Sequence, residues 1–322
     1  MPETRAHPPA VFLGPSANFA GPAGRRGLAC LAAYVLAFTG PLGPAWAGEA
    51  KPAVPYAVAH DAPLKATEKL VKDADDLKQF RVEFNGIKGD RVPAFLYVPK
   101  KGKPRRPAVL LQYGSGGNKS TGYITTLGHQ FAARGFVVLT IDAPGRGERA
   151  PKQKKRFAWL DFDHERQVFV QYLGDDSRAV DYLMSRPDVD PRRLAFVGIS
   201  WGAITGIPFV AHDPRVKAMA SMVGGGDVLS VLPPKMPDKV RQAIKPLDPV
   251  NTVSLIAPRP LLLLNVTRDQ LIPRACAEAL HKAAGKGAKV VWLDTDHYFH
   301  GQDRGKIADS VIDFLLEHLP AR

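Results

Sequence analysis

The sequence has 322 residues, a formal charge of +13, 45% hydrophobic residues and 23% charged residues, proportions that are ordinary for a globular protein. Its two cysteines exclude a disulfide-rich scaffold and a four-thiolate zinc site. With 29 Gly and 29 Pro it is too poor in both for a collagen-like chain, and it has no run of about 18 apolar residues that would predict a membrane-spanning helix.

The first 47 residues have the three-part layout of a secretory signal peptide. Arg25 and Arg26 precede an apolar stretch over 28–38, and the AWA tripeptide at 45–47 supplies small residues for a cleavage site. We therefore expect cleavage after about Ala47 and a periplasmic or secreted protein. The sequence leaves the export route, general or twin-arginine, open. Cleavage would lower the charge to +11 and leave Cys276 as the single cysteine.

The remaining chain predicts one domain over 76–322, preceded by an Ala-, Pro- and Lys-rich leader over 48–75. Alternating apolar and polar residues predict strands at 80–84 and 92–98. Short continuous apolar runs then predict strands buried on both faces of a parallel sheet, at 108–111, 136–141, 194–199, 218–223, 261–266 and 290–293. Helical segments lie between them, around 180–184 and at 275–284 and 307–319. This alternation predicts an α/β fold with a mainly parallel sheet.

The sharpest local motif is GISWG at 198–202, directly after a predicted strand and before a segment that can be helical. A serine on a tight strand-to-helix turn has its hydroxyl held clear of the sheet, and the flanking glycines permit close backbone approach. The pentapeptide alone is a weak signal, but its placement makes Ser200 a candidate nucleophile.

A serine nucleophile needs a base and an acid that orients the base. In this architecture the chain order is Ser, then Asp or Glu, then His. Asp269 follows the strand predicted at 261–266, and His297 follows the strand predicted at 290–293. Both should share the sheet rim with Ser200, since parallel strands end there. His300 remains an alternative base and Asp227 an alternative acid.

An oxyanion hole needs two fixed N–H donors. The first candidate is the backbone of Trp201, the residue after the nucleophile. The second is Ser115 in the glycine-rich loop after the 108–111 strand, with Gly116 as the alternative. The same loop does not match either of two phosphate-binding motifs. A dinucleotide fingerprint needs a glycine where this chain has Lys119, and a Walker loop needs a glycine directly before its lysine, which Lys119 does not have.

Three further clusters admit weaker interpretations. Acidic and histidine residues gather at 161–165 and 294–297, but without an HExxH-type helix we expect no metal. The basic run from Lys152 to Arg156 would suit an anionic substrate or polymer, and a solvated loop is the interpretation we favour. The aromatic residues Phe157, Trp159 and Phe162 would suit either a substrate cleft or a core.

Several motifs together resemble α/β-hydrolases, in particular the dienelactone hydrolase and acetyl xylan esterase-like branch. They are the 113–118 loop, DAPGRG at 142–147, DVDP at 188–191, the Ser200 turn and Arg259-Pro260. The resemblance covers about 80–319 and implies an eight-stranded sheet with antiparallel first strands, and ester hydrolysis through an acyl-enzyme. Dienelactone hydrolases proper use Cys as nucleophile, and many relatives have His where this chain has Tyr113.

The sequence therefore predicts an exported serine hydrolase that cleaves small-molecule or carbohydrate esters of carboxylic acids. We expect no cofactor, no nucleic-acid partner and no stable membrane insertion. A prolyl oligopeptidase-like peptidase and a non-catalytic binding protein on the same fold are the alternatives. The acyl group, the alcohol and the oligomeric state stay open.

Overall fold

Nine strands form one sheet in the order β1-β2-β3-β5-β4-β6-β7-β8-β9. The computed structural model describes residues 56–151, 162–231 and 238–319. Pairing is antiparallel at one end of the sheet, between β1 and β2, β2 and β3, and β3 and β5. All pairs in the rest of the sheet order, β5-β4-β6-β7-β8-β9, are parallel. The strands are β1 (Thr67–Asp73), β2 (Leu77–Asn85), β3 (Arg91–Pro99), β4 (Arg106–Gln112), β5 (Val137–Ile141), β6 (Val189–Ile199), β7 (Ala218–Met222), β8 (Leu261–Arg268) and β9 (Ala288–Asp296).

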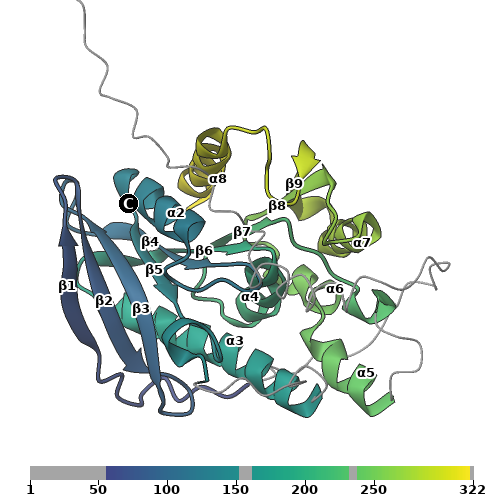
Figure 1. The fold of residues 1–322 in the computed structure, drawn as a ribbon, viewed down its shortest axis with the longest axis horizontal. Coiled ribbons are helices and arrows are strands. Elements are labelled where there is room, and N and C mark those ends of the chain that lie inside the picture. Colours follow the sequence, from purple (N-terminus) through teal and green to yellow (C-terminus); the bar gives the residue numbers. More distant parts are fainter. Residues whose placement is uncertain (1–55, 152–161, 232–237, 320–322) are drawn as a thin grey trace, which may run out of the picture.

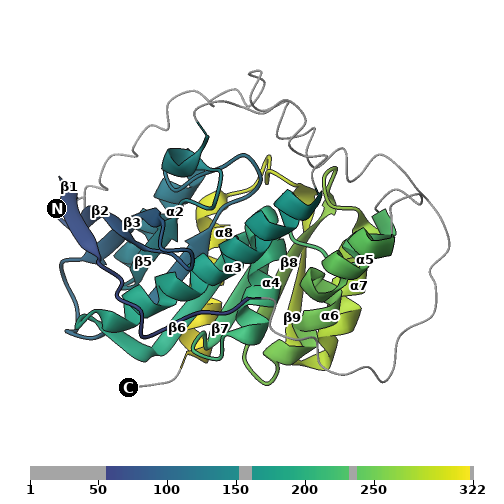
Figure 2. The same ribbon diagram turned by 90° about the horizontal axis from the view of Figure 1, so that it is seen from below.

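Helices cover both faces of the sheet, as Figures 1 and 2 show. One face carries α2 (Gly122–Ala133) and α8 (Arg304–His318), which contact each other. The opposite face carries α3 (Phe162–Ser185), α4 (Trp201–His212) and α7 (Arg274–Ala284). Two shorter helices, α5 (Asp238–Ile244) and α6 (Pro249–Thr252), lie between β7 and β8 in the chain. This is the mainly parallel α/β architecture that the sequence predicts.

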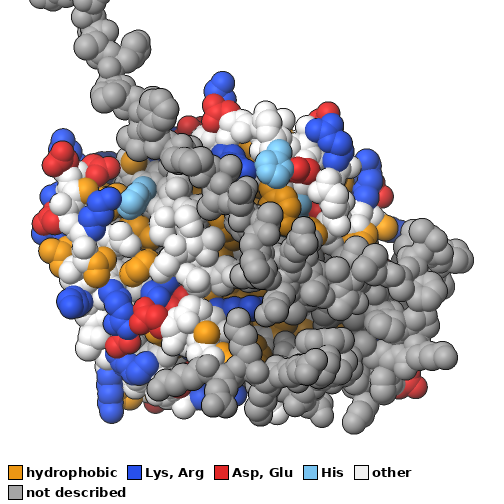
Figure 3. All heavy atoms as spheres, viewed as in Figure 1, with side chains coloured by type: hydrophobic (Ala, Val, Ile, Leu, Met, Phe, Trp, Pro, Cys, Tyr) orange, Lys and Arg blue, Asp and Glu red, His pale blue; other side chains and the backbone are white. Residues whose placement is uncertain are grey.

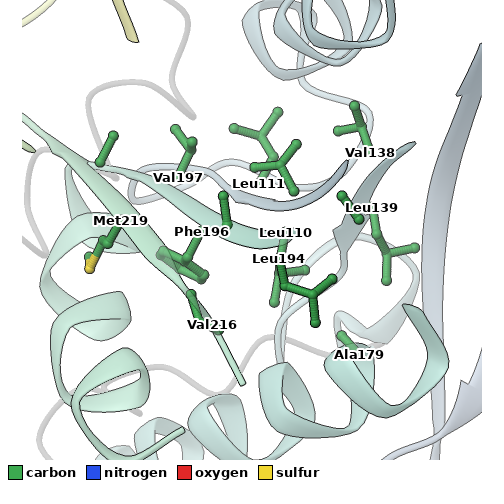
Figure 4. Packing of buried hydrophobic residues seen from close by; sticks show 14 of the residues in the cluster. Leu110, Leu111, Val138, Leu139, Ala179, Leu194, Phe196, Val197, Val216 and Met219 are labelled. Carbon is green, nitrogen blue, oxygen red and sulfur yellow. The ribbon is translucent and has the colours of Figure 1, made fainter. Parts of the chain in front are cut away.

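The core lies where the central strands meet these helices. Every residue of β5 and β7 is buried, because helices cover both of their faces. Side chains alternate across the sheet: Leu111 and Val197 project to one side in Figure 4, and Phe196 projects to the other. Continuous apolar sequence in these strands thus follows from burial on both sides.

The sheet has one strand more than the eight expected. The additional strand is β1, which pairs with β2 at the sheet edge and is exposed along its whole length. β1 lies within the stretch expected to be a leader, 48–75. Further contacts also join this stretch to the domain, because the buried guanidinium of Arg178 donates hydrogen bonds to the carbonyl oxygens of Ala59 and Ala62.

Surface charge is mixed over the antiparallel end of the sheet. Basic and acidic side chains lie side by side around β1, β2 and β3 in Figure 3. One ion pair of this part of the sheet joins Lys100, the residue after β3, to Asp73 of β1. The signal peptide predicted at 1–47, the basic run from Lys152 and the aromatic residues Phe157 and Trp159 lie outside the described residues. Among the residues that the structure does describe, no helix is long and apolar enough to cross a membrane.

Candidate active site

Ser200 occupies a sharp turn between β6 and α4. Its φ is +54° and its ψ is −113°, a conformation that non-glycine residues rarely adopt and that marks a strained functional turn. The flanking glycines are required by space: a Cβ on Gly198 would lie 2.3 Å from the carbonyl oxygen of Gly202, and a Cβ on Gly202 would lie 2.7 Å from that of Gln112. The GISWG motif therefore forms the turn that its position in the sequence predicts.

A chain of hydrogen bonds joins the three residues expected to form the catalytic centre. The Ser200 hydroxyl and Nε2 of His297 are 3.0 Å apart, and Nδ1 of His297 lies 2.8 Å from Oδ2 of Asp269. Because a carboxylate can only accept, Nδ1 carries the ring hydrogen and Nε2 is left to accept from the serine hydroxyl. Ser200 and His297 are 4% and 6% exposed, so these bonds are shielded from water.

The loop that follows β8 fixes the orientation of Asp269. Its Oδ1 accepts the backbone N–H groups of Leu271 and Ile272 at 2.8 and 2.9 Å. The carboxylate therefore reaches His297 in one defined orientation. His297 itself follows the end of β9, so all three residues lie beyond the carboxyl ends of parallel strands, as the sequence predicts.

The alternative acid and base have other partners. The N–H of Asp227 donates to Oδ1 of Asp248, and the residue has a positive φ of +55°. His300 is exposed and its Nδ1 lies 2.6 Å from Oδ2 of Asp296. The hydrogen-bonded chain through Ser200 thus contains Asp269 and His297 and neither alternative residue.

The loop expected to supply an oxyanion donor lies against Ser200. A Cβ on Gly114 would lie 3.1 Å from Cβ of Ser200, so the backbone passes directly beside the serine. Ser115 follows in a turn closed by a hydrogen bond from the N–H of Gly117 to the carbonyl oxygen of Gly114, at 3.1 Å. Trp201 opens α4, where the first N–H groups have no intrahelical partner and the helix dipole favours negative charge.

A buried ion pair that sequence analysis missed holds this loop to β5. Lys119 is 2% exposed, and its Nζ lies 2.7 Å from Oδ2 of the fully buried Asp142. Asp142 also accepts the backbone N–H groups of Lys119 and Glu148, at 3.0 and 2.9 Å. One signal was present in the sequence: Asp142 directly follows the 136–141 apolar run, so it shares the sheet rim with the loop.

A second network lies beneath the loop, where β4 ends. Tyr172 donates its hydroxyl hydrogen to Oε1 of Gln112 at 2.8 Å, and Nε2 of Gln112 donates to Oδ1 of Asp176. Asp176 is fully buried, and burial raises its pKa well above the ordinary value. Oδ2 of Asp176 makes no hydrogen bond within the described residues. Burial therefore favours the neutral form of this carboxyl over the ionised one.

A small apolar cluster lies beside the nucleophile. Ile204, Ile272 and Cys276 form its buried part, with Trp201 against them. Burial raises the pKa of Cys276 to about 11, so the thiol stays protonated at neutral pH. Cys276 is therefore a packing residue on α7 and lacks the thiolate that a cysteine nucleophile needs.

The described residues contain no group of three or more His, Cys, Asp or Glu side chains placed to hold a metal ion. Of the two clusters named in the sequence, the one at 161–165 lies outside the residues whose side chains are described. In the other, the hydroxyl of Thr267 donates to Asp294, and Asp296 lies against His300.

The fold and the strand–turn–helix placement of Ser200 define an α/β-hydrolase. Two solved structures of similar fold are the acetyl xylan esterase from Paenibacillus sp. R4 and acetyl xylan esterase 1 from Thermoanaerobacterium sp. JW/SL YS485. Their TM-scores are 0.68 and 0.65 at 20% and 19% identity, and each comparison covers 81% of this chain and 90% of the other.

Residues 92–310 match the dienelactone hydrolase family, and the chain belongs to that family. YtaP of Bacillus subtilis (strain 168) is 28% identical over 221 residues, which cover 62% of this chain and 74% of YtaP. Esterase YjfP of Escherichia coli (strain K12) is 28% identical over 207 residues, which cover 58% of this chain and 80% of YjfP. The family and these relatives support a hydrolase that acts on esters.

Proposed function

We propose that the protein is a serine hydrolase that cleaves carboxylic esters through an acyl-enzyme on Ser200. The observation that carries this proposal is the hydrogen-bonded chain from Ser200 through His297 to Asp269 on a strained turn. A free serine hydroxyl is a poor nucleophile, and a neutral imidazole 3.0 Å away is placed to remove its proton.

In the first half-reaction, Oγ of Ser200 attacks the ester carbonyl carbon while Nε2 of His297 takes the hydroxyl proton. The carbonyl π electrons move onto the oxygen, whose charge the N–H groups of Trp201 and Ser115 stabilise. When these electrons return, the bond to the alkoxy group breaks and His297 gives its proton to the leaving alcohol. Asp269 accepts from the imidazolium throughout and stays ionised.

In the second half-reaction, water attacks the acyl carbon and His297 takes a proton from it. Collapse of the second tetrahedral intermediate breaks the bond to Oγ, returns the proton to Ser200 and releases the carboxylic acid. The apolar side chains of Ile204 and Ile272 pack against Trp201, the residue that follows the nucleophile. The substrate class is a small-molecule or carbohydrate ester.

Steady-state turnover tests this function against the peptidase and binding-protein alternatives. We expect the protein to hydrolyse p-nitrophenyl acetate and to leave prolyl peptide anilides intact, with Ser200→Ala reducing ester turnover by at least about 10³-fold. Preferential cleavage of the anilides would instead support the peptidase. Ester turnover that is absent, or equal in Ser200→Ala, would contradict the proposal.

Export is a separate part of the proposal and rests on the sequence of residues 1–47. Cell fractionation followed by N-terminal sequencing tests it. We expect the protein in the periplasm or medium with an N-terminus at about Gly48. A cytoplasmic protein that retains residues 1–47 would contradict export without affecting the catalytic proposal.

A further inference from the structure

Tyr123, which sequence analysis did not single out, contacts the loop beside the nucleophile. It lies in the first turn of α2, and its hydroxyl oxygen accepts the N–H of Gly114 at 2.8 Å. This bond occupies the Gly114 N–H, which therefore cannot serve as an oxyanion donor at the same time. The candidate loop donors that remain are Ser115 and its alternative, Gly116.

The tyrosine hydroxyl and the serine face the same small space. A Cβ placed on Gly114 would lie 3.1 Å from Cβ of Ser200 and 3.5 Å from the hydroxyl oxygen of Tyr123. One methyl-sized volume at Gly114 thus borders both Cβ of Ser200 and the hydroxyl oxygen of Tyr123.

The hydroxyl of Tyr123 retains a hydrogen to donate. The bond from Gly114 uses a lone pair of the oxygen, and a phenol can accept and donate at once. Within the described part of the chain, the Tyr123 hydroxyl donates no hydrogen bond. Burial raises the pKa of Tyr123 to about 12, so the group remains a protonated donor at neutral pH.

We propose that Tyr123 is a third oxyanion donor, an inference that rests on the serine-hydrolase function proposed above. Its hydroxyl hydrogen forms a hydrogen bond to the carbonyl oxygen as negative charge develops on it. The proton stays on the phenol throughout, so no bond is made or broken at Tyr123. The Gly114 N–H orients the phenol oxygen, and Tyr123 in turn ties α2 to the oxyanion loop.

Tyr123→Phe removes this donor, and Tyr113→Phe is the matched control. The Tyr113 hydroxyl also accepts a backbone N–H, from Ala143 at 2.7 Å, and belongs to the same loop. Both variants therefore lose one buried hydroxyl–backbone bond, but the Tyr123 hydroxyl bonds Gly114 beside Ser200, whereas the Tyr113 hydroxyl bonds Ala143 after β5. Thermal unfolding of both variants measures the structural effect separately from the catalytic one.

We expect Tyr123→Phe to lower kcat for p-nitrophenyl acetate by about 10²- to 10³-fold, the effect of removing one oxyanion donor, with little change in KM. Affinity for a boronic acid, whose serine adduct is tetrahedral, should fall by a similar factor. Tyr113→Phe should retain kcat within about threefold. The inference is overturned if Tyr123→Phe keeps wild-type kcat, if both variants lose kcat equally, or if boronic acid affinity is unchanged.

A fluorinated tyrosine at position 123 separates donation from loop positioning even where Tyr123→Phe is unstable. Fluorine lowers the phenol pKa, and the phenolate formed on raising the pH still accepts the Gly114 N–H but has no hydrogen to donate. We expect kcat of this variant to fall at a pH where wild-type kcat is constant. An unchanged pH profile would overturn the inference. Wild-type turnover and its loss in Ser200→Ala test the proposed function independently.

Discussion

Oδ2 of Asp269 lies 2.8 Å from Nδ1 of His297, while Oδ1 of the same carboxylate accepts two backbone N–H groups of the following loop. In Asp269→Asn, the amide oxygen should keep these two N–H bonds, which places the amide NH₂ against Nδ1. At these atom positions the NH₂ group lies 2.8 Å from Nδ1 and the amide oxygen 2.9 Å from it. Donation from the NH₂ group makes Nδ1 an acceptor and moves the ring hydrogen to Nε2, where it blocks proton removal from Ser200. We expect kcat to fall by about 10⁴-fold, as for the wrong histidine tautomer in a serine protease triad.

Ester hydrolysis kinetics measure this effect, and Asp296→Asn is its control. Asp296 is the carboxylate that precedes His297, and it bonds the backbone N–H groups of Tyr298 and His300 and the exposed His300 ring. Its side chain is therefore outside the hydrogen-bonded chain from Ser200 through His297 to Asp269. We expect Asp296→Asn to keep kcat within about threefold. Equal losses in the two variants would argue against a special role for Asp269.

Gly114→Ala tests the close approach of the oxyanion loop to the nucleophile. The added methyl group would lie 3.1 Å from Cβ of Ser200, so the loop or the serine must shift by a few tenths of an ångström. Small displacements of reacting groups lower rates strongly, and we expect kcat to fall by about 10- to 100-fold. The control is Gly122→Ala, where a Cβ has no heavy atom within 4 Å. Similar turnover of p-nitrophenyl acetate by the two variants would contradict this packing.

The ion pair between Lys119 and Asp142 should stabilise the fold as well as the loop. Lys119→Met leaves a fully buried carboxylate without its ammonium partner, which costs about 3–5 kcal/mol when one member of a buried pair is removed. Lys100→Met breaks a solvent-exposed pair with Asp73 and should change the free energy of unfolding little, because water screens such pairs. Urea unfolding measures the free energy of unfolding of both variants. Equal values for the two would show that the Lys119 pair contributes no more to stability than an exposed pair.

Asp176 predicts a pH dependence of stability. Its pKa is raised on folding, so between the ordinary carboxyl pKa of 3.8 and the raised folded value the native state binds more protons than the unfolded chain. The free energy of unfolding therefore falls as pH rises through this window, by up to about 1.4 kcal/mol per pH unit. Asp176→Asn mimics the protonated acid and should remove this slope.

Urea unfolding of wild type and Asp176→Asn between pH 4 and pH 8 measures the difference. We expect the variant to gain stability relative to wild type as pH rises, because its amide does not ionise. Gln112 can still donate to the amide oxygen, so this hydrogen bond is kept. A variant that loses stability by the same amount at every pH would show instead that the carboxyl is ionised in the folded protein.

The central strands could be predicted because burial on both faces leaves an uninterrupted apolar run, as at 261–266 in β8. β1 could not, since its seven residues are all exposed and carry no apolar pattern; pairing with β2 alone makes it a strand. The helix α2 was missed for a related reason: only a few of its residues, among them Ile124 and Phe131, are buried.

The site around Ser200 likewise has one part that could be predicted from the sequence and one part that could not. Ser200, Asp269 and His297 each lie just beyond a predicted strand, so chain order and the shared rim were sufficient to bring them together. Tyr123 and Lys119 act through contacts with Gly114 and Asp142, and such contacts depend on how α2 and the loop pack. No local pattern of residues encodes that packing.

Labelling with a fluorophosphonate, followed by mass spectrometry of the intact protein and its peptides, tests most directly whether Ser200 is the nucleophile. A fluorophosphonate reacts with an activated serine and forms a stable tetrahedral adduct on its Oγ. We predict one adduct per chain, located on the peptide that contains Ser200, and none in Ser200→Ala. A folded wild-type protein that fails to label, an adduct on another residue, or equal labelling of Ser200→Ala would contradict the proposed mechanism.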